Sequence, residues 1–155
     1  MAKWLSISAL VVLLDQITKY VANTGLVYAE AIPVVPSFNL TLMYNRGAAF
    51  SFLSDAAGWQ RWFFVAISLG ASVLLVIWLR KLKPQQWVLA VALSLVLGGA
   101  LGNLIDRLWL GYVIDFIQLY YKGFYWPAFN VADSAISVGA VLLIWDALFA
   151  KPKDV

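Results

Sequence analysis

Four long apolar stretches dominate the pattern of hydrophobic and polar positions along the chain. They cover residues 4–21, 59–79, 87–105 and 132–150. Because about 20 helical residues cross the hydrocarbon core of a bilayer, each stretch has the length of one transmembrane helix. The pattern predicts an all-α membrane protein with four transmembrane helices. The first stretch contains Asp15 and Lys19, and no small-residue cleavage site follows it, so we expect a retained helix rather than a signal sequence.

The two longer connections, residues 23–58 and 107–131, are not plain linkers. In residues 38–44 apolar and polar side chains alternate, which is the period of a half-buried strand. A turn signal and a second candidate strand, residues 48–53, follow, so we expect a small extracytoplasmic β-sheet. The second connection is rich in aromatic residues, which predicts an interfacial aromatic segment. Its aromatic residues are Phe116, Tyr120, Tyr121, Phe124, Tyr125, Trp126 and Phe129.

The amino-acid composition agrees with this topology. Hydrophobic residues make up 63% of the 155 residues and charged residues 12%, whereas soluble domains contain about 45–50% apolar and about 25% charged residues. A chain of this composition cannot cover a globule with polar surface. Four spans leave no room for a large soluble domain, so we expect a single integral membrane domain over residues 1–155.

Basic residues predict how the helices are oriented. They are Arg80, Lys81 and Lys83 between the second and third spans, Lys3 near the start, and Lys151 and Lys153 near the end. Because cytoplasmic loops carry the excess of Lys and Arg, both termini are expected in the cytoplasm and both long connections outside. The net charge of +3 fits this topology signal better than nucleic-acid binding.

The absence of two residue types limits the possible chemistry. The chain has no His and no Cys, which excludes imidazole bases, thiolate nucleophiles, disulfides and zinc sites built from these residues. We therefore expect neither a metal ion nor a cofactor. Most acidic residues fall in the outer half of the predicted topology, so any reaction is expected on that side of the membrane.

Charged residues at membrane depth need a partner or a function, because each costs at least about 2.5 kcal/mol on insertion scales. Asp15 and Lys19 are four residues apart on one helix face, so we expect an ion pair. The glycines in residues 98–102 have a small-xxx-small spacing that favours close helix packing. Asp106 and Arg107 follow at the outer end of the third helix. They either form a salt bridge at the rim or help to shape a site.

The strongest chemical signal is the pair Asp115 and Asp133. Asp115 has apolar neighbours on both sides and no basic residue nearby in sequence. Asp133 opens the fourth helix, where it is either an anion favoured by the helix dipole or simply the N-cap. Two carboxylates that share a proton can activate water for amide hydrolysis. A channel or transporter lined by acids and a structural membrane scaffold are the alternatives.

Five ordered motifs extend over nearly the whole chain. They are Leu14-Asp-Gln-Ile-Thr-Lys19, Tyr44-Asn-Arg-Gly-Ala-Ala-Phe-Ser51, Gly98-Gly-Ala-Leu-Gly-Asn-Leu-Ile-Asp-Arg107, Val113-Ile-Asp-Phe116 and Phe129-Asn-Val-Ala-Asp-Ser134. In this order they resemble the motifs of the lipoprotein signal peptidase family, also called signal peptidase II. The resemblance implies a bacterial aspartic endopeptidase of the inner membrane. Such an enzyme removes the signal peptide of a prolipoprotein on the amino side of the diacylglyceryl-modified cysteine.

The resemblance also implies roles for particular residues. Asp115 and Asp133 would be the catalytic pair. The residues implied to build or support the site are Asp15, Lys19, Asn45, Gly47, Asn103, Asp106, Arg107, Asn130 and Ala132. The implied partners are lipidated prolipoprotein signal peptides and membrane lipid, with no nucleic acid, and we expect a monomer whose site faces the periplasm. An extended substrate segment is expected to pair with residues 38–44 by strand addition.

Overall fold

The computed structural model of the chain describes residues 1–47 and 58–149. Its helices are α1 (Ala2–Gly25), α2 (Trp59–Lys81), α3 (Trp87–Trp109) and α4 (Val131–Phe149). Its strands are β1 (Ala31–Val35), β2 (Phe38–Asn45), β3 (Val113–Tyr121) and β4 (Phe124–Tyr125). The second candidate strand, residues 48–53, lies outside the described residues.

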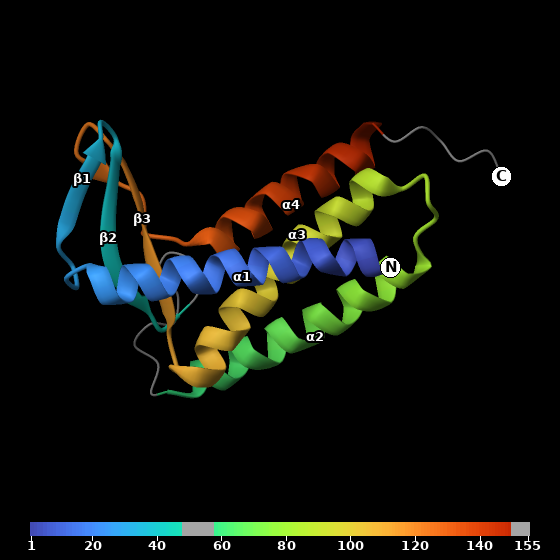
Figure 1. The fold of residues 1–155 in the computed structure, drawn as a ribbon, viewed down its shortest axis with the longest axis horizontal. Helices are drawn as coiled ribbons and strands as arrows, with labels where there is room; N and C mark the ends of the chain where they lie inside the picture. Colours follow the sequence, from blue (N-terminus) through green and yellow to red (C-terminus); the bar gives the residue numbers. More distant parts are fainter. Residues whose placement is uncertain (48–57, 150–155) are drawn as a thin grey trace.

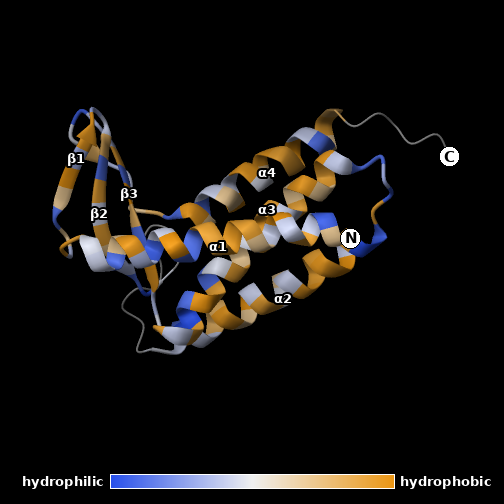
Figure 2. Ribbon diagram, viewed as in Figure 1, coloured by the Kyte–Doolittle hydropathy of each residue, from blue (hydrophilic) through white to orange (hydrophobic). Residues whose placement is uncertain are grey.

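The predicted transmembrane helices are confirmed. In residues 1–47 and 58–149, four helices are long and apolar enough to cross a membrane, and their ends agree with the predicted spans to within four residues. Apolar residues run along all four helices (Figure 2), and large side chains such as Leu13, Leu74 and Trp145 are exposed. The start of α1, the end of α4 and the α2–α3 loop lie at one end of the bundle, and the sheet lies at the other (Figure 1).

α3 is the central helix of the bundle and packs against the other three (Figure 1). Its glycines allow the backbones to approach closely. A Cβ atom added to Gly98 would lie 2.7 Å from the Cβ of Val11 in α1, and one added to Gly99 would collide with the carbonyl oxygen of Ala132 in α4. The packing role predicted for residues 98–102 is therefore confirmed.

The sheet is antiparallel, and the strands that the structure describes run in the order β1-β2-β3-β4. β2 confirms the strand predicted for residues 38–44 and extends it to Asn45. It pairs with β1 on one side and with β3 on the other. The pairing with β3 contains a bulge between Leu40 and Met43 of β2. Met43 lies directly opposite Asp115, so the sheet carries one of the two candidate catalytic residues.

The aromatic segment expected between α3 and α4 folds largely as β3 and β4. Its later aromatic side chains, such as Tyr121 and Phe124, are exposed, whereas the first four residues of β3 are buried. Strand addition of a substrate along the whole of residues 38–44 is wrong as a prediction, because β3 pairs with one edge of β2 and β1 pairs with the other edge from Phe38 to Thr41.

Candidate active site

Segments that are far apart in the sequence meet where the sheet joins the bundle. α1 contributes Asp15 and Lys19, β2 and the following turn Asn45 and Gly47, α3 Asn103, Asp106 and Arg107, β3 Asp115, and the α4 start Asn130, Ala132 and Asp133. Hydrogen bonds and ion pairs connect every one of these residues into a single network. The structure thus brings together all the site residues named from the sequence.

The start of α4 fixes the position of Asp133. Asn130 precedes the helix, and its Oδ1 accepts a hydrogen bond from the backbone N–H of Asp133 at 2.9 Å. In return, Oδ2 of Asp133 accepts a hydrogen bond from the backbone N–H of Asn130 at 3.2 Å. This reciprocal arrangement is a capping box. Asn130 is therefore the N-cap, and the interpretation of Asp133 as the N-cap is wrong.

Asn130 also connects the two candidate catalytic residues. Its side-chain Nδ2 donates to Oδ1 of Asp115 at 2.7 Å, while its backbone N–H donates to Asp133. The same Nδ2 lies 3.2 Å from Oδ1 of Asn103 and 3.2 Å from the carbonyl oxygen of Ile114. One residue, held by acceptors on α3 and β3, thus bridges both carboxylates.

Asp115 is enclosed by the sheet and by Asn130, and only 2% of it is exposed. Its second oxygen, Oδ2, accepts a hydrogen bond from Nδ2 of Asn45 at 3.1 Å. Burial, and then the negative charge of Asp133, raise the pKa of Asp115 to about 7, against the lowering effect of the hydrogen bonds from Asn45 and Asn130. A carboxyl group with this pKa can hold or release a proton near neutral pH.

Lys19 is the cation at the centre of the network and is 2% exposed. Its Nζ lies 2.7 Å from Oδ2 of Asp15 and 2.9 Å from Oδ2 of Asp106, so the predicted pair with Asp15 is confirmed. Nζ also donates to Oδ1 of Asn103 at 2.9 Å, and Nδ2 of Asn103 donates to Oδ1 of Asp133 at 2.8 Å. Lys19 is therefore linked to Asp133 through a single amide.

The two acidic partners of Lys19 tie α1 and α3 to other elements. Oδ1 of Asp15 accepts the backbone N–H of Ala132 at 2.9 Å, which satisfies a free donor in the first turn of α4. Oδ2 of Asp106 accepts the backbone N–H of Ile114 at 3.1 Å, one residue before Asp115. Both carboxylates therefore fix the backbone close to a candidate catalytic residue.

Arg107 does not form the rim salt bridge with Asp106 that one interpretation predicted. In the described part of the chain, the ion pairs of Asp106 run to Lys19, and Nη2 of Arg107 instead donates to the carbonyl oxygen of Gly47 at 3.0 Å. The backbone N–H of Gly47 donates to Oδ1 of Asn45 at 3.0 Å, which leaves Nδ2 of Asn45 for Asp115. Arg107 thus supports the turn that positions Asn45.

No cluster suited to a metal ion is found within residues 1–47 and 58–149.

Comparison with known proteins decides the family. The family model for signal peptidase (SPase) II matches residues 7–149. The chain belongs to the signal peptidase II family. It is 58% identical over 147 residues to a lipoprotein signal peptidase of Teredinibacter turnerae, covering 95% of this chain and 88% of that one. It is 56% identical over 154 residues to a lipoprotein signal peptidase of Acinetobacter baumannii, covering 97% and 88% of the two chains.

A solved structure agrees with this assignment. A bacterial membrane enzyme determined by the in meso method at 2.3 Å resolution is 35% identical, with a TM-score of 0.84 over 100% of this chain and 95% of that one. Together with the four apolar helices, membership of the signal peptidase II family makes the chain a multi-pass bacterial membrane peptidase that acts on the signal peptides of prolipoproteins.

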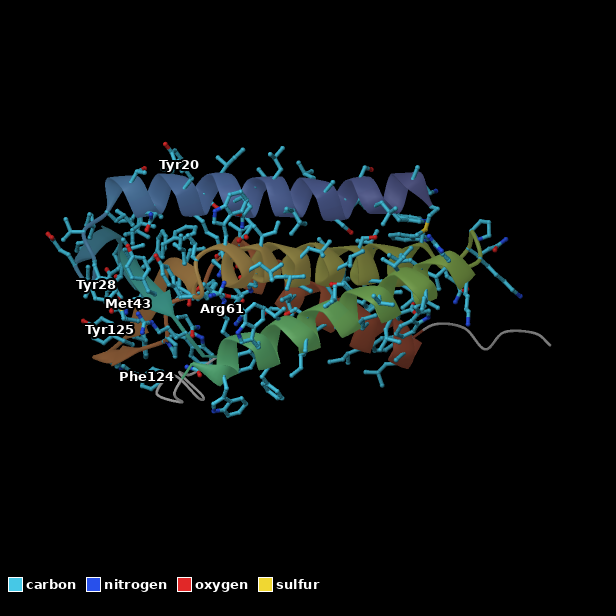
Figure 3. The ribbon with its side chains drawn as sticks, turned by 90° about the horizontal axis from the view of Figure 1, so that it is seen from below. Tyr20, Tyr28, Met43, Arg61, Phe124 and Tyr125 are labelled. Carbon is cyan, nitrogen blue, oxygen red and sulfur yellow. The ribbon has the colours of Figure 1, made fainter. Side chains whose placement is uncertain are left out.

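Two residues of the site were not singled out from the sequence. Nε2 of Gln16 donates to Oδ1 of Asp106 at 2.9 Å and lies 3.3 Å from the carbonyl oxygen of Gly102, so it joins α1 to α3. Arg61 reaches from α2 towards α3 (Figure 3) and donates to the carbonyl oxygen of Arg107 at 2.8 Å. Gln16 lies within the first signal peptidase II motif, whereas Arg61 lies in none of the motifs, and only the tertiary structure reveals it.

Proposed function

We propose that Asp115 and Asp133 are the catalytic pair of an aspartic endopeptidase. In this proposal the enzyme cuts prolipoproteins on the amino side of a diacylglyceryl-modified cysteine. The observation that carries the proposal is the bridge through Asn130, whose side chain holds Asp115 and whose backbone holds Asp133. Two acids connected in this way, one of them with a pKa of about 7, match the needs of general acid–base catalysis near neutral pH.

The surroundings of the pair assign each carboxyl group a role. Asp115 keeps the shared proton at rest, because burial and the charge of Asp133 both raise its pKa. Asp133 carries the negative charge, which the hydrogen bonds from Asn103 and Asn130 and the N-terminus of α4 stabilise. The negative charge of Asp133 contributes to the raised pKa of Asp115, so the two roles depend on each other in the resting enzyme.

The reaction uses one water molecule between the two carboxyl groups. Asp133 takes a proton from the water while the water oxygen attacks the carbonyl carbon of the scissile peptide bond. The protonated Asp115 donates a hydrogen bond to the carbonyl oxygen and stabilises the charge that develops there. When the tetrahedral intermediate collapses, the amine leaving group receives a proton from the pair, and the signal peptide leaves with the new carboxylate.

The other residues of the network act by position rather than by contact with substrate. Lys19 forms ion pairs with Asp15 and Asp106, and these two acids hold the backbone N–H groups of Ala132 and Ile114. Each of these N–H groups belongs to the residue immediately before a catalytic aspartate. A small displacement here is amplified at the reacting atoms, because misplacement by about 1 Å can reduce a rate about hundredfold.

The proposal places both termini in the cytoplasm and the site on the outer face, in a single-domain monomer. The basic α2–α3 loop supports this orientation. Cysteines introduced at Lys122 and Lys83 test it in a chain without native thiols. An impermeant thiol reagent added outside the cell should label the first and not the second. Labelling of the second alone would contradict the orientation.

The proposed substrate can be tested with a precursor that is prepared with and without the lipid. Purified protein in one bilayer preparation is mixed with each form of the precursor under single-turnover conditions, and the masses of the products are measured by mass spectrometry. We expect cleavage directly before the modified cysteine, and slower cleavage of the unlipidated form by about a hundredfold or more. Equal rates for the two forms, or a cut at another bond, would contradict the proposed specificity.

A further inference from the structure

The start of α2 meets the end of α3 at the sheet end of the bundle (Figure 1). α2 packs mainly against α3, and none of the site residues implied by the motifs belongs to it. Its first turn carries Arg61, which is half-buried and whose side chain reaches towards α3 (Figure 3). This contact is the point at which α2 comes close to the network around the catalytic pair.

Arg61 binds the carbonyl end of α3. The last four carbonyl oxygens of a helix have no partner within the helix. In α3, Nε of Arg61 donates to the carbonyl oxygen of Arg107 at 2.8 Å, and Nη2 donates to that of Leu108 at 2.8 Å. The positive charge of Arg61 is also favoured by the negative end of the helix dipole. A planar guanidinium can form both bonds at once, whereas the ammonium group of a Lys lacks this fork.

A second contact from α2 holds the side chain of Arg107. Phe64 lies three residues after Arg61, on the same face of α2. Its ring centroid is 5.1 Å from Cζ of Arg107, a distance suited to a cation–π interaction. Cζ of Arg61 itself lies 5.1 Å from the ring centroid of Trp62. α2 therefore supports Arg107 at its backbone through Arg61 and at its guanidinium through Phe64.

Hydrogen bonds lead from Arg107 to the buried carboxyl group of Asp115. Nη2 of Arg107 donates to the carbonyl oxygen of Gly47 at 3.0 Å. The backbone N–H of Gly47 donates to Oδ1 of Asn45 at 3.0 Å, and Nδ2 of Asn45 donates to Oδ2 of Asp115 at 3.1 Å. Each step is a single hydrogen bond, so a displaced Arg107 would change how Asn45 meets Asp115.

We propose that Arg61 is a positioning residue for the peptidase reaction. By holding the end of α3 it fixes Arg107, and through Gly47 and Asn45 it fixes the carboxyl group of Asp115. The inference rests on the proposed function, in which Asp115 is catalytic. If Arg61 only stabilised the packing of α2 on α3, its loss would reduce the amount of folded protein without changing the reaction of the molecules that fold.

The first test measures kcat and KM separately with a lipidated precursor. Arg61→Gln removes the charged fork, and Arg61→Lys keeps the charge without the fork. Arg80→Gln makes the same change at an exposed position in the last turn of the same helix and is the control. We expect kcat of Arg61→Gln to fall roughly tenfold while KM stays close to that of the wild type, because the reacting groups are misplaced. Arg61→Lys should lose less, and Arg80→Gln should behave as the wild type.

The second test is the pH dependence of kcat/KM, which a change in the amount of folded protein does not move. The hydrogen bond from Asn45 lowers the pKa of Asp115, and the guanidinium of Arg107 interacts electrostatically with the same carboxyl group. Weakening either contact raises the pKa of Asp115. The fall of kcat/KM above about pH 7, where Asp115 loses its proton, should therefore occur at higher pH in Arg61→Gln than in the wild type and in Arg80→Gln.

The other charged groups that act on Asp115 are Asp133 and Lys19. Asn103, four residues before the end that Arg61 binds, holds both of them, so we expect them to stay in place.

Two results would overturn the inference. One is a folded Arg61→Gln variant with the kcat of the wild type, and the other is a lower kcat with an unchanged pH dependence. If Arg61→Gln does not fold, the same two measurements on Arg61→Lys decide, and a Lys variant identical to the wild type in both would overturn it. Failure of the proposed function would appear differently, as absent cleavage of the lipidated precursor by the wild type or near-normal turnover by Asp115→Asn.

Discussion

Replacing Asp115 by Asn should change how the stability of the protein depends on pH. In the folded chain, burial and then the charge of Asp133 raise the pKa of Asp115 from an ordinary value of 3.8 to about 7. Between these two values, the folded state keeps a proton that the unfolded state has released. The free energy of unfolding of the wild type therefore falls as the pH rises from about 4 to about 7.

The magnitude of this effect follows from the difference between the two pKa values. One pKa unit corresponds to about 1.4 kcal/mol, so the full contribution is about 4 kcal/mol. Asn has no titrating proton, so Asp115→Asn avoids this loss. The substitution also carries a pH-independent cost, because Asp115 accepts amide hydrogen bonds through both oxygens and Asn has only one. The informative quantity is therefore the change with pH of the stability difference between variant and wild type.

The assay is unfolding of wild type and Asp115→Asn in the same detergent at about pH 4 and about pH 8. We expect the stability of the variant relative to the wild type to rise by up to about 4 kcal/mol between the two conditions. Asp146→Asn, which removes a carboxylate near the far end of α4, controls for the loss of one charge. If the free energies of unfolding of wild type and Asp115→Asn changed by the same amount between the two pH values, the reasoning would be refuted.

Three further outcomes follow from the same network. The kcat/KM of the wild type should fall as the pH rises through about 7, because Asp115 loses the proton that the acid step needs; a rate that still rises at pH 8 would argue against this. Lys19→Met should lower the free energy of unfolding by about 3–5 kcal/mol, because it leaves two buried carboxylates without their cation, and an unchanged melting temperature would exclude that role. Gly99→Ala should destabilise the protein by about 1–3 kcal/mol through collision with the carbonyl oxygen of Ala132, whereas Gly70→Ala, whose Cβ would meet no atom of residues 1–47 and 58–149 within 4 Å, should be tolerated. Equal stabilities of these two glycine variants would contradict the packing argument.

Most of the fold could be predicted because lipid and water impose simple patterns. Each span can be predicted from its length and hydropathy, and β2 from its alternating apolar and polar residues. The alternation predicts the strand but not its buried face, because the polar Asn39 and Thr41 are buried whereas Phe38 and Leu40 are only partly buried. β3 shows no such alternation, because its first four residues are all buried. β1 is exposed along its whole length, so its sequence carries no burial pattern either.

The site could be predicted as a set of residues but not as a network. The motifs name the residues, yet the hydrogen bond between Asp15 and the backbone of Ala132 joins positions that are 117 residues apart. The dual role of Asn130, as N-cap of α4 and as donor to Asp115, likewise needs β3 and α4 in place. Because Asp106 and Arg107 are adjacent in sequence, a mutual salt bridge was the simplest expectation, but the fold directs them to different partners.

The most direct test of the central claim is single-turnover cleavage of a lipidated precursor by Asp115→Asn, Asp133→Asn and the double variant. Folding is checked by the melting temperature of each purified protein. If the two carboxyl groups act as one unit, each single variant should lose nearly all activity and the double variant should be about as inactive as either one. Near-normal turnover in either folded single variant would contradict the assignment of Asp115 and Asp133 as the catalytic pair.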